Sequence, residues 1–302
     1  MTYANPAPRP RRSVLYMPGA NARALQKAKV LAADAVIFDL EDAVAPEAKS
    51  DARALVTDAV SGGGYDPREV IIRINALNTE WGEADLKAAV KAGPDAILAP
   101  KVEKASDIAL LDDAMTKAGA HTDIALWVMI ETPLAILNLK EIAAATETSR
   151  LSTFVMGTND LAKDMRAEQT PFREPFLPAL ALSVTAARAF GLTVIDGVHN
   201  DIQDVGGFDA VCRQGRALGF DGKTLIHPSQ IETCNAVFAP AEDDVAQARD
   251  VIAAFADPDN SGKGVLKVNG KMTELLHLEA AKRLVAVADR IAAFEKEMAQ
   301  GD

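Results

Sequence analysis

The stretch Ala125-Leu-Trp-Val-Met-Ile-Glu-Thr-Pro133 shows the unit that repeats through most of this chain. Its first six residues are apolar, which is typical of a strand buried on both faces. A glutamate follows the strand, and a proline then opens the helical stretch 134–145. Similar apolar runs recur along the chain, and together they lie at 13–17, 35–40, 70–74, 96–100, 125–130, 153–156, 193–195 and 223–226.

Amphipathic stretches separate these runs, so strands and helices alternate. Strands that are apolar on both faces and alternate with helices predict parallel pairing through right-handed crossovers. The eight units therefore predict an α/β fold, a (β/α)8 TIM barrel. An open, doubly wound sheet is the alternative, because the number of strands does not prove closure. The first turn, Pro18-Gly-Ala-Asn21, lacks the glycine fingerprint of dinucleotide-binding sheets.

The pattern changes after the eighth strand. Residues 229–238, 243–255 and 274–298 read as helices, and the turn-rich stretch 257–264 separates the last two. A short apolar piece, 264–268, leads to a turn at Asn269-Gly270. We divide the chain into a loose N-terminal arm (1–12), a barrel (13–238) and a C-terminal helical extension (239–302) that acts as a lid or a subunit contact.

Composition excludes several classes of protein. With 302 residues, 49% hydrophobic and 25% charged, the chain can bury a large core and is not disordered. A net charge of −11 argues against general nucleic-acid binding. No apolar run approaches the roughly 18 residues of a membrane span, and the N-terminal arm has no apolar core, so we expect no membrane segment or secretory signal. Two cysteines, read as reduced thiols, predict a cytoplasmic protein.

Polar side chains stand at nearly every predicted strand end. In a barrel these ends share one rim, where active sites lie. The rim offers carboxylates but neither thiolates nor paired imidazoles, which favours Mg²⁺ or Mn²⁺ over zinc. Glu131 and Asp160, at the ends of neighbouring strands, are the predicted metal ligands. The alternative is that either carboxylate caps the helix that follows it.

Other rim residues leave alternatives open. Arg73 ends a strand among apolar neighbours, so it pairs with an acid or with a substrate carboxylate. Alternation along a strand predicts that Asp39 and Glu41 point one way and Asp42 the other, and that at least one supports the site indirectly. Lys101 is a Schiff-base lysine or a salt bridge to the acidic rim, and His227 is a base or a hydrogen-bonded turn histidine.

One basic cluster stands out on this acidic chain. It is either an anion-binding patch or a solvated helix face. Its members are Arg11, Arg12, Arg23, Lys27 and Lys29.

Seven segments occur in the order and spacing of the CitE-like family, which includes the citrate lyase β subunit and the malyl-CoA and citramalyl-CoA lyases. They are Arg12-Ser-Val-Leu-Tyr-Met-Pro-Gly19, Ile37-Phe-Asp-Leu-Glu-Asp-Ala-Val44, Ile72-Arg-Ile-Asn75, Ala99-Pro-Lys101, Ile130-Glu-Thr-Pro133, Gly157-Thr-Asn-Asp160 and Ile226-His-Pro-Ser229. The resemblance spans about residues 12–295. The chain also resembles the branch of short relatives that includes (3S)-malyl-CoA thioesterases.

The resemblance implies a TIM barrel that assembles as a homotrimer or hexamer, with Mg²⁺ at Glu131 and Asp160 and coenzyme A as part of the substrate. Arg73 matches the arginine that binds the ketoacid or hydroxyacid part of the substrate. Glu41 and Asp42 match an acidic network that we count as catalytic. Further expected substrate or CoA contacts are Lys27, Arg23, Arg12, Gly157 and Thr158.

The C-terminal segment departs from the family pattern. In the malyl-CoA lyases a lid from a neighbouring subunit supplies an aspartate as acid and base, whereas the matching stretch here carries Glu274. The resemblance implies a Mg²⁺-dependent enzyme acting on malyl-CoA or a methylated relative. It cleaves the C–C bond by retro-Claisen chemistry to an acyl-CoA plus glyoxylate or pyruvate, hydrolyses the thioester to malate and CoA, or does both.

Two alternatives keep the same fold. One is a metal-dependent aldolase of CoA-free 2-ketoacids. The other is a subunit like citrate lyase β, which needs an acyl-carrier-protein partner.

Overall fold

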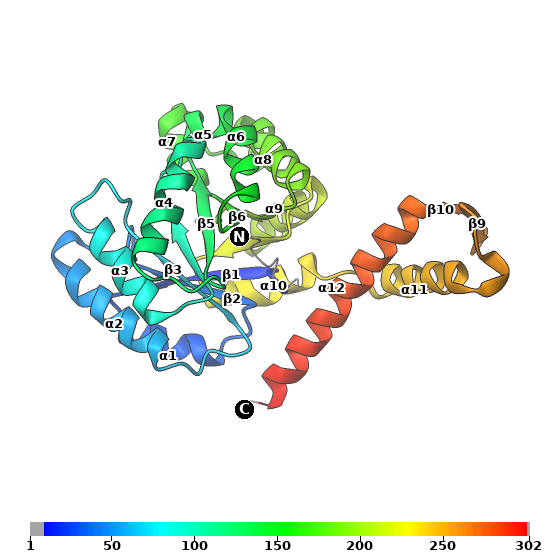
Figure 1. Cartoon of the computed structure of the whole chain (residues 1–302), viewed down its shortest axis with the longest axis horizontal. Coiled ribbons are helices and arrows are strands. Elements are labelled where there is room, and N and C mark those ends of the chain that lie inside the picture. The colour runs from blue at the N-terminus through cyan, green and yellow to red at the C-terminus, as the bar shows by residue number, and fades with distance from the viewer. Residues whose placement is uncertain (1–8, 301–302) are drawn as a thin grey trace. The chain divides into compact units, whose positions relative to one another are not determined.

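The predicted barrel is closed. In the computed structural model, which describes residues 9–300, eight parallel strands pair in chain order and β1 pairs with both β2 and β8 (Figure 1). This closure confirms the TIM barrel and excludes the open sheet. The strands are β1 Ser13–Pro18, β2 Ala35–Asp39, β3 Glu69–Arg73, β4 Ala96–Ala99, β5 Ala125–Ile130, β6 Leu151–Met156, β7 Thr193–Asp196 and β8 Gly222–Leu225.

Helices surround the barrel strands, as the alternation of apolar runs and amphipathic stretches predicts (Figure 1). The stretch 134–145 divides into two helices at Asn138, whose side chain donates to the carbonyl of Glu103. Helix α7 is short and largely polar, with Leu161 and Ala162 as its buried apolar residues. The helices are α1 Ala22–Lys27, α2 Lys49–Ser61, α3 Gly82–Ala92, α4 Ala105–Lys117, α5 Pro133–Leu137, α6 Leu139–Ala144, α7 Thr158–Met165, α8 Leu177–Ala189, α9 Val205–Leu218 and α10 Ile231–Phe238.

The core has two layers, as the pleat of buried parallel strands requires. On β2, Val36 and Phe38 belong to the large cluster that includes residues of the helices, whereas Ala35 and Ile37 belong to a second cluster made of strand residues alone. Trp127 is the largest side chain of this inner cluster and is fully buried. Burial on both faces explains why the strands read as continuous apolar runs.

The described residues form two compact units. One comprises residues 11–238, and the other comprises residues 239–300 with Arg9 and Pro10. The second unit contains α11 Glu242–Ala256, a hairpin of β9 Val265–Val268 and β10 Lys271–Glu274, and α12 Leu275–Gln300. Its own small core joins α11, β9 and α12.

The extension is therefore not wholly helical, which corrects the prediction. Asn269 and Gly270 both have positive φ, 48° and 80°. This pair of left-handed residues makes the tight turn that joins two antiparallel strands. The predicted helix 274–298 begins one residue later, at Leu275.

The predicted N-terminal arm also needs correction. Its first eight residues lie outside the described part of the chain. Arg11, however, donates to Glu69, Thr153 and Thr193, and Arg12 holds Asp34, so neither arginine is loose. Among the described residues, no helix is long and apolar enough to cross a membrane.

Candidate active site

The pleat of the barrel aims three site residues into its mouth. Ile37, Ile71 and Met129 belong to the inner cluster, and residues two positions further along a strand share the same face. Asp39, Arg73 and Glu131 are those residues, and all three are buried. Register completes the placement, because Asp39 pairs directly with Arg73 on the neighbouring strand.

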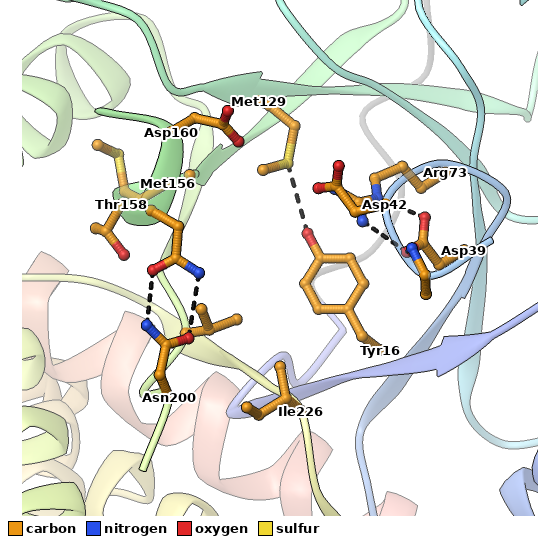
Figure 2. A pocket seen from close by; sticks show the side chains of 14 residues that line it. Tyr16, Asp39, Asp42, Arg73, Met129, Met156, Thr158, Asp160, Asn200 and Ile226 are labelled. Carbon is orange, nitrogen blue, oxygen red and sulfur yellow. Dashed lines mark hydrogen bonds and ion pairs between the residues drawn. The ribbon is translucent and has the colours of Figure 1, made fainter. Parts of the chain in front are cut away.

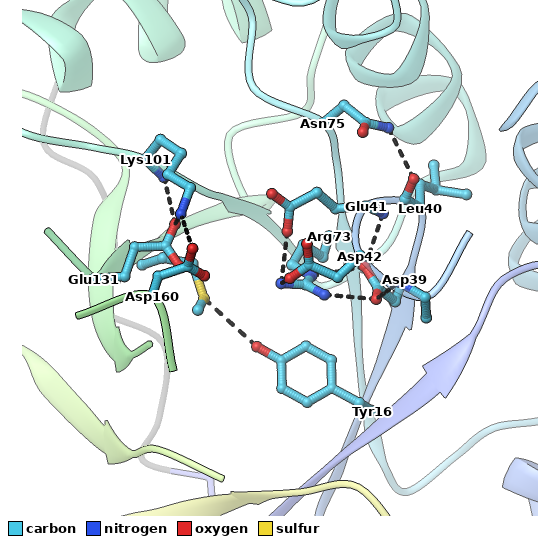
Figure 3. A network of polar contacts seen from close by, with 12 residues as sticks. Tyr16, Asp39, Leu40, Glu41, Asp42, Arg73, Asn75, Lys101, Glu131 and Asp160 are labelled. Carbon is cyan, nitrogen blue, oxygen red and sulfur yellow. Dashed lines mark hydrogen bonds and ion pairs between the residues drawn. The ribbon is translucent and has the colours of Figure 1, made fainter. Parts of the chain in front are cut away.

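Arg73 is the centre of an acidic cluster (Figure 3). Its guanidinium donates to both Asp39 oxygens, from Nε at 2.7 Å and from Nη2 at 2.6 Å. Its Nη1 lies 2.7 Å from Glu41 Oε2 and 3.1 Å from Asp42 Oδ2. The predicted alternation of Glu41 and Asp42 is therefore wrong, and both acids reach the same arginine.

The reason is a turn directly after β2. Strand β2 ends at Asp39, whose carboxylate accepts hydrogen bonds from the backbone N–H groups of Glu41 and Ala43. The buried Lys49 ammonium donates to the carbonyls of Leu40 and Glu41. The backbone leaves the extended conformation at this turn, so the two-residue period of a strand no longer applies.

Burial changes the ionisation of Glu41. Desolvation raises its pKa from 4.5 to about 8; Arg73 opposes the rise, while the charges of Asp42, Glu131 and Asp39 add to it. At neutral pH this carboxyl is therefore largely protonated and can donate a proton.

A second cation sits between the two predicted metal ligands (Figure 3). The Lys101 ammonium lies 2.6 Å from Asp160 Oδ1 and 3.6 Å from Glu131 Oε1. Burial acts to lower the pKa of Lys101, but the hydrogen bond to Asp160 and the charge of Glu131 outweigh it and raise the pKa. A Schiff-base lysine needs a lowered pKa, so the salt-bridge alternative for Lys101 is the one found.

Neither predicted metal ligand caps a helix. Thr132 caps α5 through its hydroxyl, which accepts from Ala135 N, and the residue preceding α7 is Gly157, not Asp160. Glu131 is only 1% exposed, and burial raises its pKa to about 7 against the opposing charge of Lys101. Both carboxylates contact the Lys101 ammonium.

Gly157 makes room for Glu131. A Cβ at this position would lie 2.4 Å from Glu131 Cβ and 2.6 Å from its Oε2. Only glycine fits so close to the glutamate, which explains why this residue stands between the end of β6 at Met156 and the start of α7.

Asp39, Asp42, Arg73, Gly157 and Asp160 border one cavity of about 280 Å³ (Figure 2), whereas Glu41, Lys101 and Glu131 are not among its lining residues. The Tyr16 hydroxyl points into it and lies 3.5 Å from Met129 Sδ, and the Tyr16 ring supports the Arg73 guanidinium at 4.9 Å. Burial raises the pKa of Tyr16 well above its ordinary value, so the phenol keeps its proton. The lining residues include Tyr16, Asp39, Asp42, Arg73, Met129, Met156, Gly157, Thr158, Asn159, Asp160, Val198, Asn200 and Ile226.

Sequence reasoning missed several of these. Tyr16 follows the inward-facing Val14 by two positions, so the pleat could have revealed it. Val198 and Asn200 lie in the loop after β7, where no periodic pattern reports side-chain direction. Gly157 and Thr158, which we predicted as substrate contacts, do line the cavity.

Four other predicted residues lie elsewhere. Arg12 precedes β1 at the opposite end of the barrel and is 4% exposed against Asp34, so it cannot contact a ligand at the mouth. Arg23 and Lys27 are exposed on α1, the helix after β1. Glu274 ends β10 in the second unit, where its side chain is exposed.

His227 behaves as the turn histidine of the second alternative. Its Nδ1 accepts from the backbone N–H of Ser229 and caps a short 3₁₀ turn. Asp196, another strand-end acid, is fully buried between Arg173 and Lys223 and holds those cations.

The donor set fits an oxygen-preferring divalent cation. Glu131 and Asp160 supply carboxylate oxygens, which suit Mg²⁺ with water or substrate oxygens completing the shell. Within residues 9–300 no group of three or more His, Cys, Asp or Glu side chains is placed to hold a metal ion, so a cation held by Glu131 and Asp160 would have only these two ligands from this part of the chain. An open site of this kind leaves positions for a substrate.

Comparison with known proteins agrees with this geometry. The family model for HpcH/HpaI aldolase/citrate lyase matches residues 12–228. A (3S)-malyl-CoA thioesterase of Cereibacter sphaeroides is 49% identical over 285 residues, 94% of this chain and 97% of that protein. Citrate lyase subunit beta of Haemophilus influenzae is 37% identical over 280 residues, 90% of this chain and 94% of that protein.

A solved structure is similar over almost the whole chain. Protein CitE of Mycobacterium tuberculosis, in complex with magnesium, acetoacetate and coenzyme A, is 29% identical, with a TM-score of 0.74, over 95% of this chain and 100% of that one. Fold, site and sequence lead to one conclusion: this chain belongs to the HpcH/HpaI aldolase/citrate lyase family.

Proposed function

We propose that this protein hydrolyses the thioester of (3S)-malyl-CoA to malate and CoA with a divalent cation at Glu131 and Asp160. The observation that carries the proposal is the 49% identity to a (3S)-malyl-CoA thioesterase over 94% of the chain. The cavity is consistent with it, because arginine, carboxylates and a protonated phenol surround a space suited to a small hydroxyacid.

Charge at the cavity supports the need for a cation. At this rim five carboxylates surround one guanidinium and one ammonium, and with Glu41 protonated and the other four ionised the formal charge is −2. A malyl group carries its own carboxylate, so it would be repelled without added positive charge. Mg²⁺ supplies that charge, and Mn²⁺ is an acceptable substitute with the same oxygen ligands.

The residues of this chain then divide the work. A bound divalent cation would polarise substrate oxygens and lower the pKa of water. The largely exposed Asp42 can move away from Arg73 Nη1, and this nitrogen then binds the substrate carboxylate. As water adds to the thioester and the C–S bond breaks, Glu41, protonated at neutral pH, donates its proton to the leaving CoA thiolate, and the Tyr16 hydroxyl orients the hydroxyacid.

Other parts of the proposal rest on the family resemblance. Arg23 and Lys27 contact the phosphates of CoA, and Glu274 supplies the acid and base that activates water. We also propose a cytoplasmic homotrimer or hexamer.

A C–C lyase is the second candidate, favoured by 37% identity to a citrate lyase subunit beta. The two activities differ in products, because cleavage forms glyoxylate and hydrolysis forms a free thiol. A CoA-free aldolase would not bind CoA in calorimetry. A protein of the citrate lyase β type would act only on an acyl-carrier-protein thioester.

One assay tests the proposal. Purified protein is incubated with (3S)-malyl-CoA and Mg²⁺ while glyoxylate and free thiol are followed in parallel. We expect thiol and malate without glyoxylate. Glu131→Gln and Asp160→Asn should each lower the rate by about a hundredfold or more, because each removes a cation ligand. Asp113→Asn, which changes an exposed acid on α4, is the control.

Two results would contradict the proposal. Glyoxylate without free thiol would establish the lyase instead. Full activity of Glu131→Gln in the presence of a chelator would show that the reaction needs no cation.

A further inference from the structure

Lys101 contacts Glu131 twice, through its backbone and through its side chain. Its backbone N–H donates to Glu131 Oε1 at 2.8 Å, and its ammonium lies 3.6 Å from the same oxygen. The ammonium also lies 2.6 Å from Asp160 Oδ1 (Figure 3). One positive charge therefore stands between the two carboxylates that suit a divalent cation.

The backbone of Lys101 is unusual. Its φ is 56°, in the left-handed region that residues other than glycine seldom adopt. This conformation follows Pro100 at the end of β4 and turns both the amide and the ammonium toward Glu131. Such strain persists only where surrounding contacts impose it, and it is common at functional sites.

We propose that Lys101 is a positioning residue that takes the place of the divalent cation. When no cation is bound, its ammonium holds Glu131 and Asp160 together; when the cation enters, the ammonium leaves, so binding is an exchange of one cation for another. The inference rests on the proposed function, because it takes these two acids as the ligands of the cation.

Charge and burial explain why a substitute is needed. Glu131 is only 1% exposed and the Asp160 side chain is 28% exposed, so two acids stand close together with limited access to water. Without a positive charge between them they would repel each other. A lysine suits this role, because its ammonium is a compact charge on a flexible stem.

The lysine also has a route out. Its side chain is 37% exposed, unlike the buried Arg73. Lys101 lines a second cavity of about 230 Å³, and Glu103 and Asp107 are among its other lining residues. Rotation of the side chain can move the ammonium toward these acids while the backbone N–H still holds Glu131.

Exchange has a measurable consequence. Because Mg²⁺ must displace the ammonium, the lysine weakens Mg²⁺ binding, and coupling between two ligands typically amounts to about 5- to 150-fold. Removing the ammonium should therefore tighten Mg²⁺ binding while leaving the metal-free protein less stable.

The test is direct binding of Mg²⁺ to the full-length, metal-free protein by calorimetry, with melting temperatures recorded at each Mg²⁺ concentration. We expect Lys101→Met to bind Mg²⁺ about fivefold more tightly than the unmodified protein or better. We also expect a lower melting temperature without metal and a larger rise on adding Mg²⁺. Lys104→Met is the matched control, because Lys104 lines the same second cavity without an ion pair to either ligand. It should change neither quantity.

Lys101→Arg is a second variant that keeps the charge. An arginine can hold carboxylates with two parallel hydrogen bonds, so it should weaken Mg²⁺ binding below that of the unmodified protein. This variant keeps the test decisive if Lys101→Met does not fold.

Three outcomes separate the two proposals. Equal or weaker Mg²⁺ binding by Lys101→Met would overturn the exchange. So would unchanged or tighter binding by Lys101→Arg. If Glu131→Gln and Asp160→Asn bind Mg²⁺ as well as the unmodified protein does, these two residues are not the ligands of the cation, and the proposed cation site itself is wrong.

Discussion

At the scale of single residues, the main feature of the site is that its acidic side chains outnumber its cationic side chains. Arg73 contacts three carboxylates, and Lys101 contacts two. Asp39 accepts a bidentate pair of hydrogen bonds from Arg73 and lies opposite it in the sheet, so this pair is the rigid part of the cluster. Glu41 is the acid left least compensated, since burial raises its pKa to about 8.

Glu41 should make stability depend on pH. A carboxyl whose pKa rises from 4.5 to about 8 on folding stays protonated in the native state while the unfolded state ionises. Its contribution to the free energy of unfolding is complete below pH 4.5 and is lost as the pH rises to about 8. Glu41→Gln removes this titration. The free energy of unfolding of the variant, measured relative to that of the unmodified protein, should therefore rise by about 1–3 kcal/mol from pH 5 to pH 8.

Chemical denaturation of the metal-free protein at both pH values measures this gain. Glu83→Gln is the control, because Glu83 is exposed on α3, its pKa is lowered by a hydrogen bond from Lys87, and it is ionised throughout this range. An equal difference at both pH values for Glu41→Gln would show that Glu41 is ionised in the folded protein.

At the scale of elements, the ends of strands β2 to β6 do most of the positioning. The pleat directs Asp39, Arg73 and Glu131 inward, and the turn after β2 adds Glu41 and Asp42. Strand β6 ends differently, since Gly157 leaves space for Glu131 before α7 carries Asp160 to the rim. The junction of β6 and α7 therefore sets the distance between the two carboxylates.

Gly157→Ala should disturb that junction. The new methyl group would lie 2.4 Å from Glu131 Cβ, so Glu131 or the start of α7 must move. We expect a loss of about 1–3 kcal/mol in the free energy of unfolding, together with weaker Mg²⁺ binding, because the ligands separate. Thermal unfolding and calorimetry measure the two effects.

Gly206→Ala is the matched control within α9. Its nearest neighbour would be Asp204 Oδ1 at 4.0 Å, so there is space for the methyl group. Alanine favours a helix more than glycine does, and we expect a change between zero and about 1 kcal/mol in favour of folding. Unchanged Mg²⁺ binding and stability in Gly157→Ala would show that the junction of β6 and α7 accommodates the added methyl group.

At the scale of the whole molecule, the barrel is a compact unit with its own core, and the C-terminal unit has another. All eight barrel strands and the cavity at their ends lie within residues 11–238. Folding of the barrel should therefore not depend on the extension, whereas the proposed acid and base, Glu274, lies in the extension.

A chain ending at Phe238 separates these contributions. It should keep the circular dichroism and cooperative unfolding of a folded barrel, because its core is complete. Hydrolysis of malyl-CoA should fall by about 10²- to 10⁴-fold, which is typical of a lost general acid or base. Glu274→Ala in the full chain should reproduce the loss of activity. If both proteins turn over malyl-CoA normally, the extension has no part in the chemistry.

The sequence by itself determined the eight strand–helix units, the strand ends and the two carboxylates, because these follow from local periodicity and from the rule that parallel strands end at one rim. It also led to Arg73, since an arginine within an apolar strand must find a partner. Each of these depends only on residues close together in the chain.

Only the tertiary structure decided which partners meet. That Glu41 and Asp42 share Arg73, that Lys101 stands between Glu131 and Asp160, and that Arg12 is at the far end of the barrel all depend on contacts between distant segments. Barrel closure and register create those contacts. A pattern of residues shows which side chains reach the rim, but the distances across the rim exist only once the sheet has closed.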